Sequence, residues 1–210
     1  IFRPVSLFYV VISMTRGIQY GVLVGATPLV AINFAGWAQE HVSAISGTGQ
    51  LIGGIIGMTV GGMLGDRLGA KRATILIYSC WLALNVTMIA AQPLWANSQF
   101  MTAFIITWLA LDVLVSVATI PIAMRLCNRT VAATQFTLYM ALHNFGITVG
   151  AWLLGLADTL GGIAPLFGLL AMANIVAIAI MVWVRFPTRQ IDEATADQLP
   201  QGDGLVPAVD

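Results

Sequence analysis

The segment between two long apolar stretches has the sequence Gly62-Met63-Leu64-Gly65-Asp66-Arg67-Leu68-Gly69-Ala70-Lys71-Arg72. The flanking stretches, about 42–65 and 73–92, are each close to the roughly 20 apolar residues that a helix needs to cross a bilayer. Gly69 permits a turn with positive φ, and Asp66 is suited to accept hydrogen bonds at a helix N-terminus. The segment therefore predicts a tight basic turn between two membrane-spanning helices.

The composition of the whole chain agrees with a membrane protein. Of its 210 residues, 59% are hydrophobic and only 9% are charged, so a soluble domain with this composition could not cover its surface with polar groups. The formal net charge is zero, which gives no basic surface for nucleic acid. Cys80 lies in an apolar stretch and Cys127 in a short basic loop, so we expect no disulfide. We expect no cofactor and no metal site.

Six apolar stretches are long enough to be transmembrane helices, and we expect an all-α polytopic fold. After Phe186 the chain becomes rich in Pro and acidic residues, so residues 188–210 are expected to form a disordered cytoplasmic tail. The first residue is Ile1, which favours a piece of a longer protein. The expected spans are about 5–32, 42–65, 73–92, 99–124, 133–157 and 163–185, within a half-domain of residues 1–187.

The basic residues predict the orientation of these spans, because cytoplasmic loops retain Lys and Arg. Eight of the nine fall before the first span, after the sixth, or in the loops after the second and fourth spans. Both ends of the chain are therefore expected in the cytoplasm. Tryptophans are expected at the interfaces, with Trp37, Trp95 and Trp152 near the outer face and Trp183 near the cytoplasmic one.

Glycines recur every four residues along the second span, at positions 49, 53, 57, 61 and 65. Such a surface lets another helix backbone approach closely. Gly146, Gly150 and Gly155 of the fifth span are expected to be its partner. The glycines are typical of static packing, and also of a surface on which helices rock during transport.

The segment 62–72 resembles the loop signature of the major facilitator superfamily, which lies between the second and third helices of a six-helix half. The resemblance assigns a cytoplasmic gating loop to Gly62, Asp66, Arg67, Gly69, Lys71 and Arg72. A second match covers Met124-Arg-Leu-Cys127-Asn128-Arg-Thr and Ala133-Thr134-Gln135-Phe136-Thr-Leu-Tyr139-Met-Ala-Leu. It resembles the C-terminal half of the muropeptide permease and acetyl-CoA transporter branch.

That resemblance implies two inverted three-helix repeats, about 1–92 and 93–187, and a cavity facing an opposing half. The N-terminal six-helix half or a second copy of this chain would supply that half. It also implies proton-coupled uptake by alternating access and location in a bacterial inner membrane. The implied substrate is a muropeptide, another sugar-peptide or an acyl-type anion.

Three ionisable residues, Arg16, Asp112 and His143, are expected near the middle of the bilayer. A charge there is unfavourable by roughly 2.5–3.5 kcal/mol on insertion scales, so such groups normally face a cavity or each other. In the resembled fold, the first and fourth helices of a half line the central path and the fifth flanks it. The candidate substrate and proton pathway consists of Arg16, Gln19, Tyr20, Asp112, Ser116, Tyr139, His143 and Asn144.

Each of the three has a functional and a structural interpretation. Arg16 is suited to hold an anionic substrate beside Gln19 and Tyr20 on one helix face, or to form a structural ion pair with Asp112. Asp112, above a polar stripe that includes Ser116, is suited to carry a proton. His143 could relay a proton, although a hydrogen bond between helices is the more common role of such a residue.

Two other classes of protein are weighed against a transporter. The chain has no His-Glu-x-x-His, no Cys-His metal spacing and no Gly-x-Ser-x-Gly, so we expect it not to be an enzyme. A non-transporting membrane subunit or receptor would also place polar residues in mid-membrane, to lock helices together. It would bind or signal without moving a solute.

Overall fold

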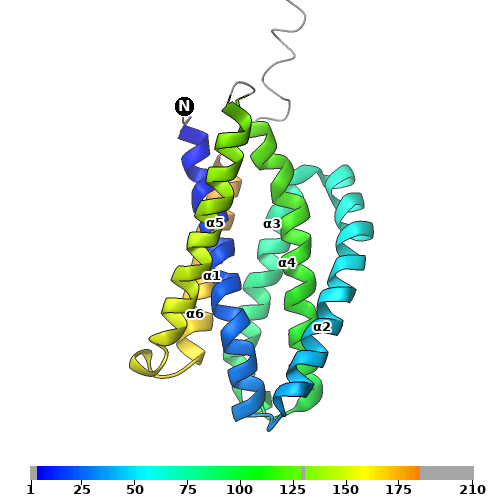
Figure 1. The fold of residues 1–210 in the computed structure, drawn as a ribbon, viewed down its shortest axis with the longest axis vertical. Helices are drawn as coiled ribbons and strands as arrows, with labels where there is room; N and C mark the ends of the chain where they lie inside the picture. Colours follow the sequence, from blue (N-terminus) through cyan, green and yellow to red (C-terminus); the bar gives the residue numbers. More distant parts are fainter. Residues whose placement is uncertain (1–3, 129–130, 185–210) are drawn as a thin grey trace, which may run out of the picture.

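The computed structural model describes residues 4–128 and 131–184, and this part of the chain is all-helical (Figure 1). The predicted all-α class is therefore confirmed. The predicted tail at 188–210 and the basic residues Arg3, Arg129, Arg185 and Arg189 lie outside the described residues. The long helices are α1 (Pro4–Asn33), α2 (Gln39–Ile56), α3 (Gly62–Ala90), α4 (Ser98–Leu126), α5 (Ala132–Gly155) and α6 (Ala164–Trp183).

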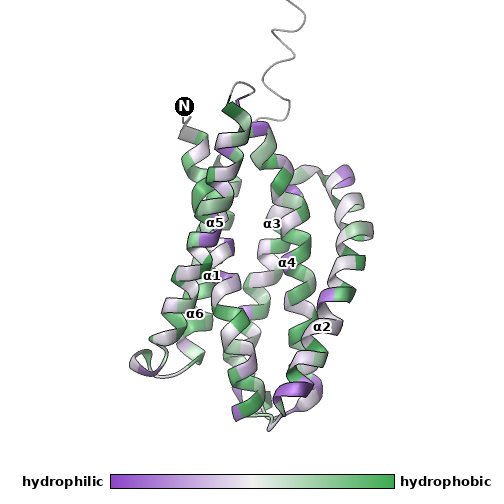
Figure 2. Ribbon diagram, in the orientation of Figure 1, coloured by the Kyte–Doolittle hydropathy of each residue, from purple (hydrophilic) through white to green (hydrophobic). Residues whose placement is uncertain are grey.

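Within the described residues, four helical stretches are long and apolar enough to cross a membrane: Val5–Asn33, Gln39–Ala90, Ser98–Leu126 and Ala164–Trp183. The second of these counts α2 and α3 together. The 24-residue α5 is not among them, and its polar residues, His143 and Asn144 at its centre, lower its hydropathy. Figure 2 shows apolar residues along most of the helical surface. The helices are those of a membrane-embedded protein.

The connection between α2 and α3 differs from a simple loop. The regular α-helix ends at Ile56, and a π-helical segment, Gly57–Gly61, joins it to α3. The helical hydrogen bonding continues through the predicted turn, apart from Gly69, where φ is +76° and ψ is 152°. This positive φ agrees with the predicted turn at Gly69, because this region of φ/ψ space is open to glycine alone. The helix is kinked at this residue.

The pattern of contacts between helices is symmetric between the first three helices and the last three. The contacting pairs include α1 with α5, α2 with α4, α3 with α6, α3 with α4, and α1 with α6. If α1 is exchanged with α4, α2 with α5 and α3 with α6, the α1–α5 pair becomes the α2–α4 pair and the α3–α4 pair becomes the α1–α6 pair. The α3–α6 pair becomes itself. In Figure 1, α3 and α6 lie behind α1 and α4, while α2 and α5 lie at the two sides.

The expected pairing of the glycines in the second and fifth spans is wrong. Gly53 packs on α4, where an added Cβ would lie 3.2 Å from the Ala110 Cα atom. Gly146 packs on α1, where an added Cβ would lie 3.2 Å from the Gly17 Cα atom. The sequence repeat identified smooth helix surfaces, but each spacing fits any close neighbour, so the partner is decided by the arrangement of the six helices.

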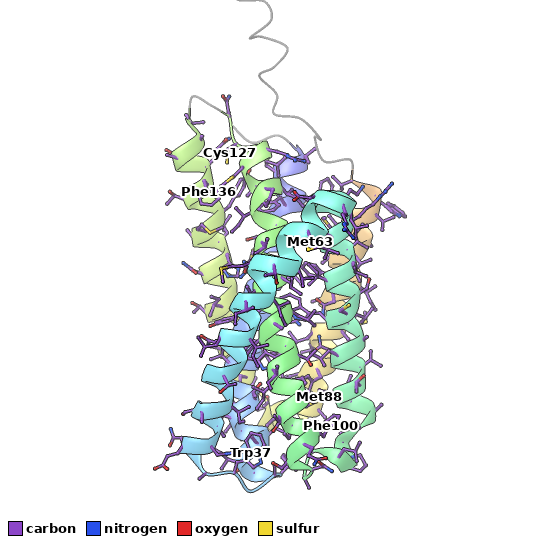
Figure 3. All side chains as sticks on the ribbon, turned by 90° about the vertical axis from the view of Figure 1, so that its right-hand side faces the viewer. Trp37, Met63, Met88, Phe100, Cys127 and Phe136 are labelled. Atoms are coloured by element: carbon purple, nitrogen blue, oxygen red, sulfur yellow. The ribbon has the colours of Figure 1, made fainter. Side chains whose placement is uncertain are left out.

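Two of the tryptophans expected at the interfaces are buried among core residues. Trp37 is 8% exposed and Trp95 is 3% exposed. The indole Nε1 of Trp37 donates to the Ser98 hydroxyl (3.0 Å), and that of Trp95 donates to the Met88 carbonyl (3.1 Å). Figure 3 shows Trp37 near one end of the bundle. Trp152 and Trp183 are exposed, at 63% and 87%.

Candidate functional site

The centre of the candidate site is an ion pair between α1 and α4. Arg16 Nε lies 3.5 Å from Asp112 Oδ1, and the side chains are 16% and 14% exposed. Neither atom has a hydrogen bond that satisfies the geometry, so the contact is a close approach of charges rather than a well-formed fork. Arg16 Nη2 donates to the Ser116 hydroxyl. The structure therefore brings together three of the predicted pathway residues, Arg16, Asp112 and Ser116.

The local sequence of α4 explains how Asp112 and Ser116 act together. They are four residues apart and therefore share one helix face. The Ser116 hydroxyl donates to the Asp112 backbone carbonyl (2.9 Å), which fixes its oxygen as the acceptor for Arg16. A small cavity of about 10 Å³, enough for about one water, lies beside Arg16 and is lined in part by Tyr9, Ser13 and Thr119.

His143 joins α5 to α1 next to this pair. Its Nδ1 lies 3.2 Å from the Ser13 backbone carbonyl oxygen. Because a carbonyl oxygen can only accept, Nδ1 is the donor of this hydrogen bond. The ring is half-buried. The hydrogen bond between helices that the sequence suggested is present. The neighbouring Asn144 is exposed on the surface of α5 and does not face the ion pair.

Tyr20 and Tyr139 do not join Arg16 and Asp112. Tyr20 packs edge-to-face on Trp108, with ring centroids 6.1 Å apart. Tyr139 is fully buried and packs edge-to-face on Tyr9 at 5.1 Å. Helix periodicity placed Tyr20 beside Arg16 and Tyr139 beside His143, but aromatic packing on neighbouring helices determines the direction of both rings.

Gln19 also leaves the expected polar face of α1. Its Oε1 accepts from Asn174 Nδ2 of α6 (2.8 Å) and from Asn85 Nδ2 of α3 (3.4 Å). Sequence reasoning missed both asparagines because it began from the ionisable groups within the spans and added only polar residues close to them along the chain. The available signal was a lone carboxamide in each of two long apolar stretches, since such groups form hydrogen bonds across helices.

The segment 62–72 lies at the end of the bundle where α2 meets α3 (Figure 1). Lys71 Nζ donates to the carbonyls of Val184 (2.9 Å) and Val182 (3.3 Å) and so caps the C-terminus of α6. Asp66, Arg67 and Arg72 are exposed. Gly62 is also exposed, with open space where a Cβ would lie. Lys71 is thus a predicted gating residue that joins α3 to the end of α6 by hydrogen bonds.

The site offers charged and hydrogen-bonding side chains from three helices. Among residues 4–128 and 131–184, no group of three His, Cys, Asp or Glu side chains is arranged to hold a metal ion. The chemistry available to Arg16, Asp112 and His143 is anion binding, proton transfer and ion pairing.

Comparison with models of protein families, with characterised proteins and with solved structures gives no significant match.

Proposed function

We propose that this chain is the C-terminal six-helix half of a major-facilitator secondary transporter that takes up a small solute together with protons. The observation that carries the proposal is the Arg16–Asp112 pair. Asp112 lies at the middle of α4, and Arg16 lies within one turn of the middle of α1. An ion pair in the middle of the helices adds little to the stability of a static fold, because a buried ion pair is no more stabilising than apolar side chains of similar volume.

The chemistry of the pair suggests how substrate and proton would be coupled. While Arg16 lies against Asp112, the cation favours the ionised carboxylate. A carboxylate or phosphate of the substrate would engage the guanidinium in its place, because Arg recognises such groups with paired hydrogen bonds. Asp112 would then take up a proton, since a lone charge in the membrane is unfavourable. Solute and proton would therefore cross together.

The packing of the helices supports the proposed architecture. The set of contacting pairs maps onto itself when the first three helices are exchanged for the last three. Three helices per repeat give an odd number of crossings, so the second repeat would be inverted in the membrane. The six long helices would then be six spans. The opposing half would be a second six-helix half or a second copy of this chain.

The same proposal includes an orientation and a location. The connection between α2 and α3 carries Arg67, Lys71 and Arg72, and α4 ends near Arg125 at the same end of the bundle (Figure 1). We place this end in the cytoplasm of a bacterial inner membrane, with both termini on that side. The segment 62–72 would act there as a gate, and the substrate would be a muropeptide, sugar-peptide or acyl-type anion.

The test is uptake into proteoliposomes with an imposed proton gradient. The chain is reconstituted alone and as any longer reading frame that encodes it, and labelled anhydromuropeptides, N-acetylated sugar-peptides and acetyl-CoA are offered in turn. We expect Asp112→Asn to abolish gradient-driven accumulation and to leave exchange of labelled for unlabelled solute. Asp158→Asn is the matched control, because this carboxylate is exposed outside the long helices.

Accumulation by Asp112→Asn at the wild-type level would remove Asp112 from the mechanism. Binding of these compounds without flux in either form of the protein would favour the receptor or subunit.

A further inference from the structure

Three carboxamides from three helices meet inside the bundle. Gln19 of α1 is 1% exposed, and Asn85 of α3 and Asn174 of α6 are fully buried. Both asparagines donate through Nδ2 to the single Oε1 atom of Gln19. We call these three residues the amide junction. It is separate from Arg16 and Asp112, and the sequence prediction assigned no role to its two asparagines.

The direct hydrogen bonds leave the junction incomplete in a specific way. Gln19 Nε2 is a buried donor with no partner, and Asn85 Oδ1 and Asn174 Oδ1 are buried acceptors with no partner. Buried polar groups are normally satisfied, and a buried water typically makes about three hydrogen bonds. One water donates two hydrogen bonds and accepts at least one, so its capacity matches the one free donor and two free acceptors.

The position of Gln19 connects this junction to the ion pair. Residues three apart on an α-helix point about 60° apart around its axis, with a rise of about 4.5 Å. Arg16 faces α4, and Gln19 faces α3 and α6. On the side of α5, α1 presents Gly17 and Gly21 to the backbone of the neighbouring helix. At these two glycines α1 has no side chain that would resist its rotation, and the hydrogen bond from His143 to the Ser13 carbonyl restrains α1 on that side. The amide junction ties α1 to α3 and α6 and so resists its rotation directly.

We propose that Gln19, Asn85 and Asn174 bind one water and that this junction fixes the rotation of α1, thereby presenting Arg16 to Asp112. The three amides are positioning residues. The proposal concerns the ion pair and not the solute, so its tests measure hydration and stability. It stands or falls independently of transport.

The first test detects the water. Uniformly ¹⁵N-labelled protein is reconstituted in deuterated lipid, and magnetisation transfer from water to the side-chain and backbone amides is followed by solid-state NMR. We expect transfer to Gln19 Nε2 at a rate at least several-fold above that of the backbone amides of the apolar neighbours Leu84 and Leu170. Transfer no faster than theirs would overturn the hydration part of the proposal.

The second test measures positioning. Thermal midpoints are recorded for the wild type, Arg16→Gln, Asp112→Asn and the double variant, and the departure from additivity gives the coupling of the ion pair. The same four proteins are then made with Gln19→Met, which keeps the length of the side chain but removes its amide. We expect the coupling to fall by at least half in that background.

A residue that only stabilises the fold would lower every midpoint and leave the coupling unchanged, and that result would overturn the positioning role. Thr27→Val is the matched control, because Thr27 is a buried polar residue of α1 outside the junction. The coupling should be unchanged with it. If Gln19→Met does not fold, Asn174→Leu is used, since it removes the stronger of the two direct bonds at 2.8 Å.

Discussion

Substitution of Gly146 by Ala tests whether close backbone packing holds α1 against α5. An added Cβ at Gly146 would lie 2.7 Å from the Met14 carbonyl oxygen and 3.2 Å from the Gly17 Cα atom. Ordinary contacts of a Cβ atom begin at 3.4 Å, so the shortfall at the oxygen is 0.7 Å. Both obstructing atoms belong to backbone, so the helices themselves must move apart. Overpacking of this kind is destabilising by about 1–3 kcal/mol.

The matched control is Gly54→Ala in α2, where no atom lies within 4 Å of the added Cβ. Alanine stabilises a helix interior by about 0.5–1 kcal/mol relative to glycine, and this gain is common to both variants. The difference between them therefore isolates the packing term. At about 2–4 °C per kcal/mol for a chain of this size, the midpoint of Gly146→Ala should lie about 2–12 °C below that of Gly54→Ala.

The assay is thermal unfolding followed by tryptophan fluorescence in lipid nanodiscs. A midpoint of Gly146→Ala equal to or above that of Gly54→Ala would refute the close contact between α1 and α5. A second readout is available because His143 lies three residues before Gly146 on α5. Separation of the helices should lengthen its bond to the Ser13 carbonyl and shift the Nδ1 resonance of His143.

Three further substitutions, at Lys71, Asn97 and Gly69, are measured in the same assay. Lys71→Met should lower the free energy of unfolding by about 0.5–1 kcal/mol and speed amide exchange in the last turn of α6, because the carbonyls of Val182 and Val184 lose their cation. The control Arg72→Met should change neither quantity, since Arg72 is exposed. Asn97→Ala should cost about 0.5–2 kcal/mol, since its side chain accepts from the first turn of α4, and Asn97→Ser should retain most of that stability. Gly69→Ala should cost about 1–3 kcal/mol because of its φ of +76°, with Gly65→Ala, where a Cβ would meet open space, as the tolerant control.

The sequence determined the features that depend on the chain's own periodicity and composition. Long apolar stretches predicted α1, α4, α5 and α6 within two residues of their observed bounds, because a backbone in lipid must satisfy its hydrogen bonds internally. The boundary between the second and third spans differs, since α2 ends at Ile56 rather than about 65 and α3 begins at Gly62 rather than about 73. Gly69 was predicted to turn, since few other residues adopt its conformation. The pairing of Arg16 with Asp112 was one of the two interpretations that the sequence allowed for Arg16, because charged groups in an apolar medium face a cavity or each other.

Only the tertiary structure decided which helix each face meets. The glycines of α2 meet α4 rather than α5, Trp37 and Trp95 turn inward, and Gln19 leaves Arg16 to join Asn85 and Asn174. Periodicity specifies the face of a helix on which a side chain lies, but the neighbour opposite that face is set by the packing of all the helices together. In a medium as apolar as the side chains themselves, close backbone contacts and a few buried polar groups make that choice, and these interactions join residues far apart in the chain.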